Sequence, residues 1–307
     1  MSMQAPSFKI ASAGGGELHC IVVKPEGEPR GMVQFVHGMA EYIERYLPTM
    51  ERLAQAGYLC FGHDHFGHGH SVTSVTQLGH LDFREGAEHL CADVLSVYRY
   101  MQAQYPELQC VLFGHSMGSF VVRAVAAQEP DLYRGVVICG TGGSNPAIGA
   151  GKALATVLAA VSGPRKHSPM MYGLMFGGYN KRFPGESAYA WLNSDHVLAG
   201  SYEDDPLCGF PFTLGGIRTL LNILGIANNK THFKRFPKTL PLLLIAGTDD
   251  PVGDYGKGVQ KVSAQYRAAG VADVTCILYE NARHEILNEF CKEKVWDDTL
   301  AFLEKTL

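Results

Sequence analysis

The feature that most constrains this fold is a short apolar run that leads directly into a pentapeptide with two glycines. Val111-Leu112-Phe113 is followed by Gly114-His115-Ser116-Met117-Gly118, and residues 119–128 have the spacing of a helix. Glycines two positions on either side of the serine allow a sharp turn and close packing of the helix on the strand. In this strand-turn-helix setting, Gly-x-Ser-x-Gly is typical of a nucleophilic serine. The sequence therefore predicts that Ser116 is a nucleophile on a strained turn.

Strands and helices alternate on both sides of this motif. An opening hairpin is expected at residues 8–11 and 18–23, on either side of Gly14-Gly15-Gly16. Further strands are expected at 32–36, 58–61, 111–113, 135–139, 240–246 and 274–279, and helices at 46–56, 83–104, 119–128, 258–269 and 292–303. This alternation predicts an α/β fold, a mostly parallel sheet with helices on both faces.

The alternation is interrupted between residues 141 and 235. This segment is rich in Gly, Pro, Met and aromatic residues, and its helical candidates are residues 151–161, 187–192 and 214–227. We interpret it as a helical cap inserted into a core formed by residues 1–140 and 236–307. Some of its apolar side chains could line a pocket, although packing within the cap is the simpler role for each one. These side chains are Met170, Met171, Met175, Phe176 and Trp191.

Composition excludes several classes of protein. The formal net charge of -4 and the absence of a basic cluster argue against a nucleic-acid partner. The first ten residues lack the pattern of a signal peptide. No apolar run approaches the roughly 20 residues of a membrane span. The eight cysteines form no Cys-x-x-Cys pair, which favours free thiols and a cytoplasmic location.

A serine nucleophile requires a base, and the base requires a carboxylate that orients it. The strand at 240–246 leads into Asp249 and Asp250, and the strand at 274–279 leads into His284. The carboxyl ends of parallel strands meet at one edge of a sheet, where such proteins bind ligands. We therefore expect Ser116, one of the two aspartates and His284 to meet at this edge.

These segments resemble the monoacylglycerol lipase and lysophospholipase group of the α/β-hydrolases. The resemblance rests on His37-Gly38-Met39, Asp64-His65-Phe66-Gly67-His68-Gly69-His70-Ser71, Gly114 to Gly118, Gly247-Thr248-Asp249-Asp250 and Arg283-His284-Glu285. It implies an α/β-hydrolase fold with an inserted helical cap, and it implies hydrolysis of carboxylic esters through an acyl-enzyme without a cofactor. It further implies that Asp250 is the catalytic acid and that the N–H groups of Met39 and Met117 form the oxyanion hole.

The resemblance also implies monoacylglycerol-like or lysophospholipid-like substrates, and a cap that could contact a membrane or micelle transiently. The alternatives are the same triad acting on a thioester, an amide or a small non-lipid ester, or a ligand-binding protein without turnover. Glu41 is interpreted as a solvated acid at a helix start, or else as a contact for a polar head group. The oligomeric state is left open.

A metal site is the rival interpretation of residues 62–71. Five side chains of this segment are potential metal ligands: His63, Asp64, His65, His68 and His70. In the resembling group the same segment is a structural turn near the site, and a catalytic metal would make Ser116 and His284 redundant. The sequence therefore favours a site without metal.

Overall fold

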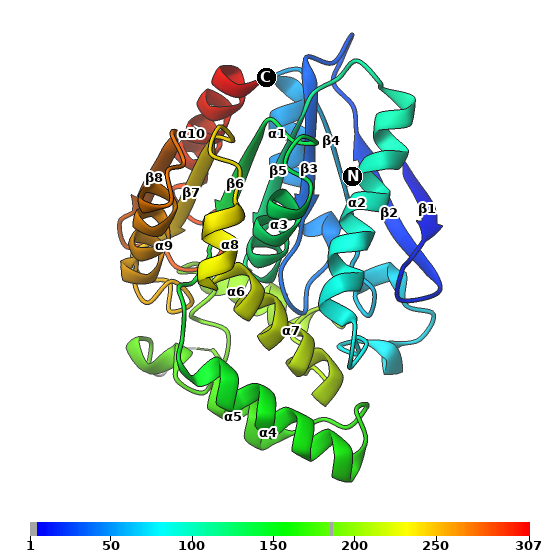
Figure 1. Ribbon diagram of the computed structural model, residues 1–307, viewed down its shortest axis with the longest axis vertical. Helices are drawn as coiled ribbons and strands as arrows, with labels where there is room; N and C mark the ends of the chain where they lie inside the picture. The colour runs from blue at the N-terminus through cyan, green and yellow to red at the C-terminus, as the bar shows by residue number, and fades with distance from the viewer. Residues whose placement is uncertain (1–4, 185–186) are drawn as a thin grey trace.

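The computed structural model describes residues 5–184 and 187–307, and its centre is one twisted sheet with helices on both faces (Figure 1). The strands are β1 (Ser7–Ala11), β2 (Glu17–Val23), β3 (Gly31–Val36), β4 (Tyr58–His63), β5 (Cys110–His115), β6 (Gly135–Cys139), β7 (Leu242–Gly247) and β8 (Val274–Tyr279). They lie in the order β1-β2-β4-β3-β5-β6-β7-β8, and only the β1–β2 and β2–β4 pairs are antiparallel. The predicted hairpin and mostly parallel sheet are confirmed.

The described residues form ten α-helices, some of which cover the two faces of the sheet (Figure 1). They are α1 (Leu47–Gln55), α2 (Gly86–Gln104), α3 (Met117–Gln128), α4 (Ala147–Ser162), α5 (Pro169–Phe176), α6 (His196–Asp204), α7 (Leu214–Ala227), α8 (Lys230–Arg235), α9 (Lys257–Ala268) and α10 (Lys292–Thr306). Single 3-10 turns are η1 (Ile43–Tyr46), η2 (Gly69–Ser71), η3 (Val75–Gln77) and η4 (Tyr179–Arg182). None of the helices in the described part of the chain combines the length and the apolar character that a transmembrane span requires.

Two apolar cores follow from the two-residue period of the strands. On β3, Met32 and Val36 point into the core under α2, α3 and α7, whereas Val33 and Phe35 point into the core under α1 and α10. Every residue of β3, β5, β6 and β7 is buried. Burial on both faces explains why these strands read as continuous apolar runs in the sequence.

Helices α4 and α5 lie beyond the carboxyl ends of the parallel strands, whereas α8 packs against α3 (Figure 1). Figure 1 shows α4 and α5 farthest from the sheet, with α7 between α4 and α3. Helix α7 has the predicted bounds, and the side chain of Thr213 caps its start by accepting from the N–H of Gly216. The sequence does not predict α5, α6 or α8.

The helix expected at residues 187–192 is wrong, because this stretch forms turns. The Asn180 side chain replaces the hydrogen bonds of a helix. Its Nδ2 donates to the carbonyl oxygens of Ser187 and Ala188, each at 2.8 Å, and its Oδ1 accepts from the N–H of Trp191 at 3.0 Å. A side chain outside the stretch therefore determines its conformation.

Close packing of α3 on β3 predicts the effect of one added methyl group. A Cβ at Gly118 would overlap the carbonyl oxygens of Val36 and His37, which cannot rotate away. We expect Gly118→Ala to lower the free energy of unfolding by at least about 3 kcal/mol. Urea denaturation measures this change.

The matched control for that substitution is Gly149→Ala. Gly149 lies inside α4, and a Cβ there would meet nothing within 4 Å. Removing a flexible glycine from a helix should raise the free energy of unfolding by about 0.5–1 kcal/mol. A destabilisation of similar size in both variants would show that close packing at Gly118 does not cause the loss of stability in Gly118→Ala.

Candidate active site

Ser116 lies on the sharp turn between β5 and α3. Its backbone has φ 53° and ψ -119°, a conformation that is uncommon for a residue with a side chain. The N–H of Ser116 donates to the carbonyl oxygen of Cys139 at 3.0 Å. The Ser116 carbonyl oxygen accepts from the N–H of Ser119 at 2.9 Å and from its Oγ at 2.6 Å. These bonds hold the strained turn, which has the geometry that the pentapeptide predicts.

Asp250 and His284 meet at the carboxyl ends of β7 and β8. Nδ1 of His284 donates to Oδ2 of Asp250 at 2.9 Å, and both side chains are buried. The other carboxylate oxygen of Asp250 accepts from the N–H of Val252 at 2.8 Å. Nε2 of His284 is buried and has no hydrogen-bond partner among residues 5–184 and 187–307. This nitrogen is therefore available to a ligand in the cavity that His284 and Ser116 both line.

The neighbouring aspartate has a different environment. Oδ1 of Asp249 lies 3.7 Å from Nη1 of Arg182, and both side chains are partly exposed to solvent. The imidazole of His284 therefore bonds to Asp250, whereas Asp249 pairs with Arg182.

The loop formed by residues 37–42 lies against the serine. A Cβ at Gly38 would come within 2.9 Å of the Cβ of Ser116, and Met39 lines the cavity. Ala40 has a positive φ of 53°, and its carbonyl oxygen accepts from Oη of Tyr202 at 2.8 Å and from the N–H of Gly209 at 3.0 Å. Segment 141–235 thereby fixes the loop.

Met117 follows Ser116 directly in the chain, whereas the loop of residues 37–42 precedes it. It is the first residue of α3 and also lines the cavity. The N–H groups of a first helical turn lack intrahelical partners, so they are suited to bind a negative charge.

Glu41 is buried, with 4% of its surface exposed, so its interpretation as a solvated acid is wrong. Its Oε1 accepts from the N–H of Gly38 at 2.6 Å and from Oη of Tyr46 at 2.8 Å. Its Oε2 accepts from Nη1 of Arg45 at 2.8 Å. Arg45 also donates to both carboxylate oxygens of Glu285, at 2.6 and 2.9 Å. One guanidinium thus joins two buried carboxylates.

His115 connects this ionic network to His284. Its Nδ1 lies 3.3 Å from Oε1 of Glu41, and its ring centroid is 4.8 Å from that of His284. Burial alone would raise the pKa of Glu41, but the hydrogen bond to His115 and the charge of Arg45 hold this pKa well below its usual range. Burial lowers the pKa of His115, yet the bond to Glu41 outweighs burial, so the pKa is raised.

Ser116 and His284 open into a cavity of about 840 Å³. Of the five side chains predicted for a pocket, four line it: Met171, Met175, Phe176 and Trp191. Met170 is not part of the wall and is 52% exposed. Further apolar wall residues from α3, α4 and α7 are not predicted from the sequence, namely Phe120, Ile148, Leu154, Leu220, Leu221 and Leu224. Their helical spacing was visible, but it does not distinguish a cavity wall from a core.

The histidines that follow β4 do not form one group. His63, His65 and His68 are fully buried. Burial lowers the pKa of His65 to about 4 and that of His68 to about 3, so both rings are neutral at pH 7. The rings of His65 and His68 pack against His37, with centroids 4.3 and 5.3 Å from it. Asp64 and His70 belong to a different cluster.

Comparison with known proteins identifies the family. Residues 27–290 match the family described as serine aminopeptidase, S33. The chain belongs to this family. The monoacylglycerol lipase of Mycolicibacterium smegmatis is 28% identical to this S33 member over 99% of this chain and 98% of its own length. The monoglyceride lipase of Homo sapiens is 28% identical over 91% of this chain and 84% of its own length.

A solved structure agrees with this assignment. The thermostable carboxyl esterase from Bacillus coagulans, in complex with glycerol, has a TM-score of 0.92 to this chain at 27% identity, covering 99% of each chain. Together, the family match, the lipase relatives and this structure confirm the predicted α/β-hydrolase fold and the predicted enzyme class, a carboxylic ester hydrolase.

Substitution of Arg45 tests the ionic network. Arg45→Met would leave Glu41 and Glu285 buried without their shared cation, so we expect the free energy of unfolding at pH 7 to fall by about 3–5 kcal/mol. The control is Arg52→Met. Arg52 is 35% exposed and pairs with Asp297, which is 66% exposed, so its loss should change stability by less than about 0.5 kcal/mol.

The loss of unfolding free energy in the Arg45→Met variant should also depend on pH, and we call this loss the deficit. Because the pKa of Glu41 is lowered in the folded state, its stabilising contribution is complete above the ordinary value of 4.5 and is lost as pH falls through the lowered pKa. In Arg45→Met, Glu41 has lost this cation, so its protonation relieves the buried charge and the deficit should narrow from pH 7 to pH 4. Chemical denaturation across this range measures it, and a pH-independent deficit would contradict the buried-charge explanation.

Proposed function

We propose that this S33-family protein hydrolyses monoacylglycerol-like or lysophospholipid-like esters through an acyl-enzyme. The observation that carries the proposal is that Ser116 and His284, the latter bound to Asp250, open into one large cavity with apolar walls. The lipase relatives, which are named for monoacylglycerol and monoglyceride, support the same reaction.

The mechanism follows from the position of each group. Ser116 attacks the ester carbonyl, and Nε2 of His284 takes the serine proton. Asp250 holds the proton on Nδ1 and stabilises the charged imidazole. The N–H groups of Met39 and Met117 bind the oxyanion. His284 then protonates the leaving alcohol, and a water molecule activated by the same nitrogen releases the acid.

The cavity supports a substrate with one apolar and one polar end. Its aliphatic wall comes from α4 and α7, where Leu154, Leu221 and Leu224 face the space. Ser144, Asn145 and Lys261 contribute polar groups to the same cavity. Transfer of each acyl CH₂ from water to an apolar wall contributes about 0.8 kcal/mol, so a long acyl chain provides most of the binding energy.

We further propose that residues 141–235 act as a cap that contacts a micelle or membrane transiently. Large apolar side chains of α4, α5 and α6 are exposed, which is unusual unless such a surface meets an apolar partner. They are Val157, Val161, Met170, Leu174, Val197 and Leu198. All eight cysteines are free thiols, which supports a reducing compartment such as the cytoplasm.

Paired substitutions of the two aspartates test the triad. Asp250→Asn should lower kcat on p-nitrophenyl butyrate by about 10³–10⁴-fold, because the imidazole loses the carboxylate that orients it. Asp249→Asn removes only a partly exposed ion pair with Arg182 and should keep kcat within about threefold of wild type. Ser116→Ala gives the rate without the nucleophile. Equal losses in both aspartate variants would refute the assignment.

The dependence of rate on acyl length tests the substrate class. We expect kcat/KM to rise by about a hundredfold from C4 to C8 esters, since four CH₂ groups contribute roughly 3 kcal/mol. Leu224→Trp should narrow the cavity and reduce this gain. Val75→Trp is the control, because Val75 is 67% exposed in η3 and does not line the cavity. A steady fall from C2 to C12, or faster cleavage of aminoacyl anilides, would reject a lipid ester as substrate.

A further inference from the structure

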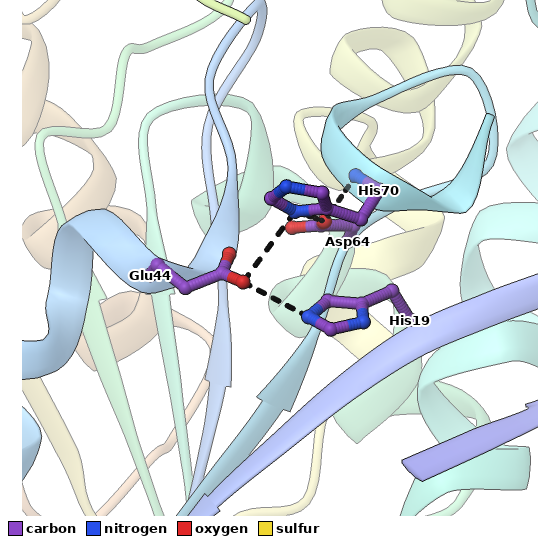
Figure 2. Close-up of side chains that lie close together, drawn as sticks. All are labelled: His19, Glu44, Asp64 and His70. Carbon is purple, nitrogen blue, oxygen red and sulfur yellow. Dashed lines mark hydrogen bonds and ion pairs between the residues drawn. The ribbon is translucent and has the colours of Figure 1, made fainter. Parts of the chain in front are cut away.

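Four side chains with metal-binding atoms gather outside the active-site cavity, and Figure 2 shows them pointing toward one another. They are His19 of β2, Glu44 of η1, Asp64 at the end of β4 and His70 of η2. None of them lines the cavity that Ser116 and His284 share. The proposed mechanism gives them no role.

The distances between the donor atoms suit a small cation. Nε2 of His19 lies 2.9 Å from Oε1 of Glu44, and Nδ1 of His70 lies 3.4 Å from the same oxygen. Nδ1 of His70 is also 3.5 Å from Oδ2 of Asp64, and the four donor atoms all lie within 4.8 Å of one another. A tetrahedral zinc ion with bonds of about 2.0–2.1 Å holds its ligands about 3.3 Å apart. Small side-chain movements would therefore complete a zinc site.

Hydrogen bonds that leave the donor atoms available fix the backbone around the cluster. The N–H of Asp64 donates to the carbonyl oxygen of His19 at 2.8 Å. Oγ of Ser71 accepts from the N–H of His19 at 2.8 Å and donates to the carbonyl oxygen of Asp64 at 2.7 Å. The polypeptide is thus preorganised before any ion binds, which lowers the entropic penalty of binding.

The carboxylates retain unused capacity for a cation. Oδ1 and Oδ2 of Asp64 accept from the N–H groups of Ile43 and His70, each at 2.7 Å, and each oxygen keeps a second lone pair. Oε2 of Glu44 is buried and has no hydrogen-bond partner in the described ranges of the chain. Oε1 of Glu44 is approached by two imidazoles. A divalent ion between the rings and the carboxylates would replace the hydrogen bond between Nε2 of His19 and Oε1 of Glu44 and the two ion pairs of His70.

We propose that this cluster binds one Zn²⁺ ion as a structural site. Two imidazoles and two carboxylates are a donor set that zinc accepts in tetrahedral geometry, and four protein ligands leave no open position for chemistry. His70, whose side chain is 51% exposed, provides the entry path. The ion would join β2, η1 and the turn after β4. Because η1 begins at Ile43, two residues after Glu41, the bound ion would also stabilise the chain that leaves the loop beside Ser116. This proposal is independent of the esterase reaction.

Direct zinc binding tests the proposal. Tag-free protein is stripped with chelator, dialysed at pH 8 and titrated with ZnCl₂ by isothermal titration calorimetry. We expect one zinc per chain with micromolar or tighter affinity, and at a hundredfold excess over Kd a rise in Tm of about 5 °C. MgCl₂ should give neither signal, because Mg²⁺ prefers oxygen ligands in an octahedral arrangement. Absence of saturable zinc binding, or an equal response to magnesium, would overturn the site.

Single substitutions then locate the ion. His19→Ala and His70→Ala each remove one ligand and should weaken zinc binding by about a hundredfold and abolish the Tm shift. The control is His89→Ala, because His89 is a partly buried histidine of α2 that pairs with Glu85 at 3.7 Å. Asp64 is left intact because it accepts hydrogen bonds from the backbone N–H groups of Ile43 and His70. Circular dichroism of the metal-free protein verifies that each variant folds. Wild-type affinity in both cluster variants would place zinc elsewhere, for example on His284, and would overturn the proposal.

Discussion

The arrangement of the active-site edge depends on how closely α3 approaches the sheet. Gly118 brings the first turn of α3 into contact with the carbonyl oxygens at the end of β3, so the chain must reverse within one residue. That residue is Ser116, and its positive φ is the local consequence. The sheet and the helix hold the strain, since both elements are fully buried around the turn. The conformation of Ser116 is therefore stabilised by tertiary packing and not by the turn itself.

A second constraint is electrostatic. Arg45 contacts Glu41, which holds the N–H of Gly38 in the loop beside the serine. It also contacts Glu285, the residue next to His284. The two loops that flank the proposed reacting atoms are thus tied to a single guanidinium. Because the carboxylates are buried, their attraction to this cation is poorly screened, and the relative position of the loops is well determined.

The sequence was most informative where a residue's role is local or set by burial on both faces. For this reason the buried strands could be predicted from the sequence, and so could α7 from the spacing of its Leu and Ile residues. Short helices were not, because single caps define them: Oγ of Ser168 accepts from Met171 at the start of α5, and Asp195 accepts from Val197 at the start of α6. The burial of Glu41 could not be predicted from the sequence either, because this burial depends on a contact network in which Arg45 and Glu285 are 240 positions apart.

These constraints converge on residues 37–46, which segment 141–235 holds from one side through the bonds of Tyr202 and Gly209 to Ala40. Tyr42 adds a further bond to this segment, because its Oη donates to Asp205 at 2.8 Å. The segment that forms most of the cavity wall therefore also fixes the loop proposed to bind the oxyanion. A ligand that displaces this segment would release Ala40 as well as open the cavity. Because the same segment carries these bonds and most of the cavity wall, a substitution that breaks them should disturb the cavity and the loop together.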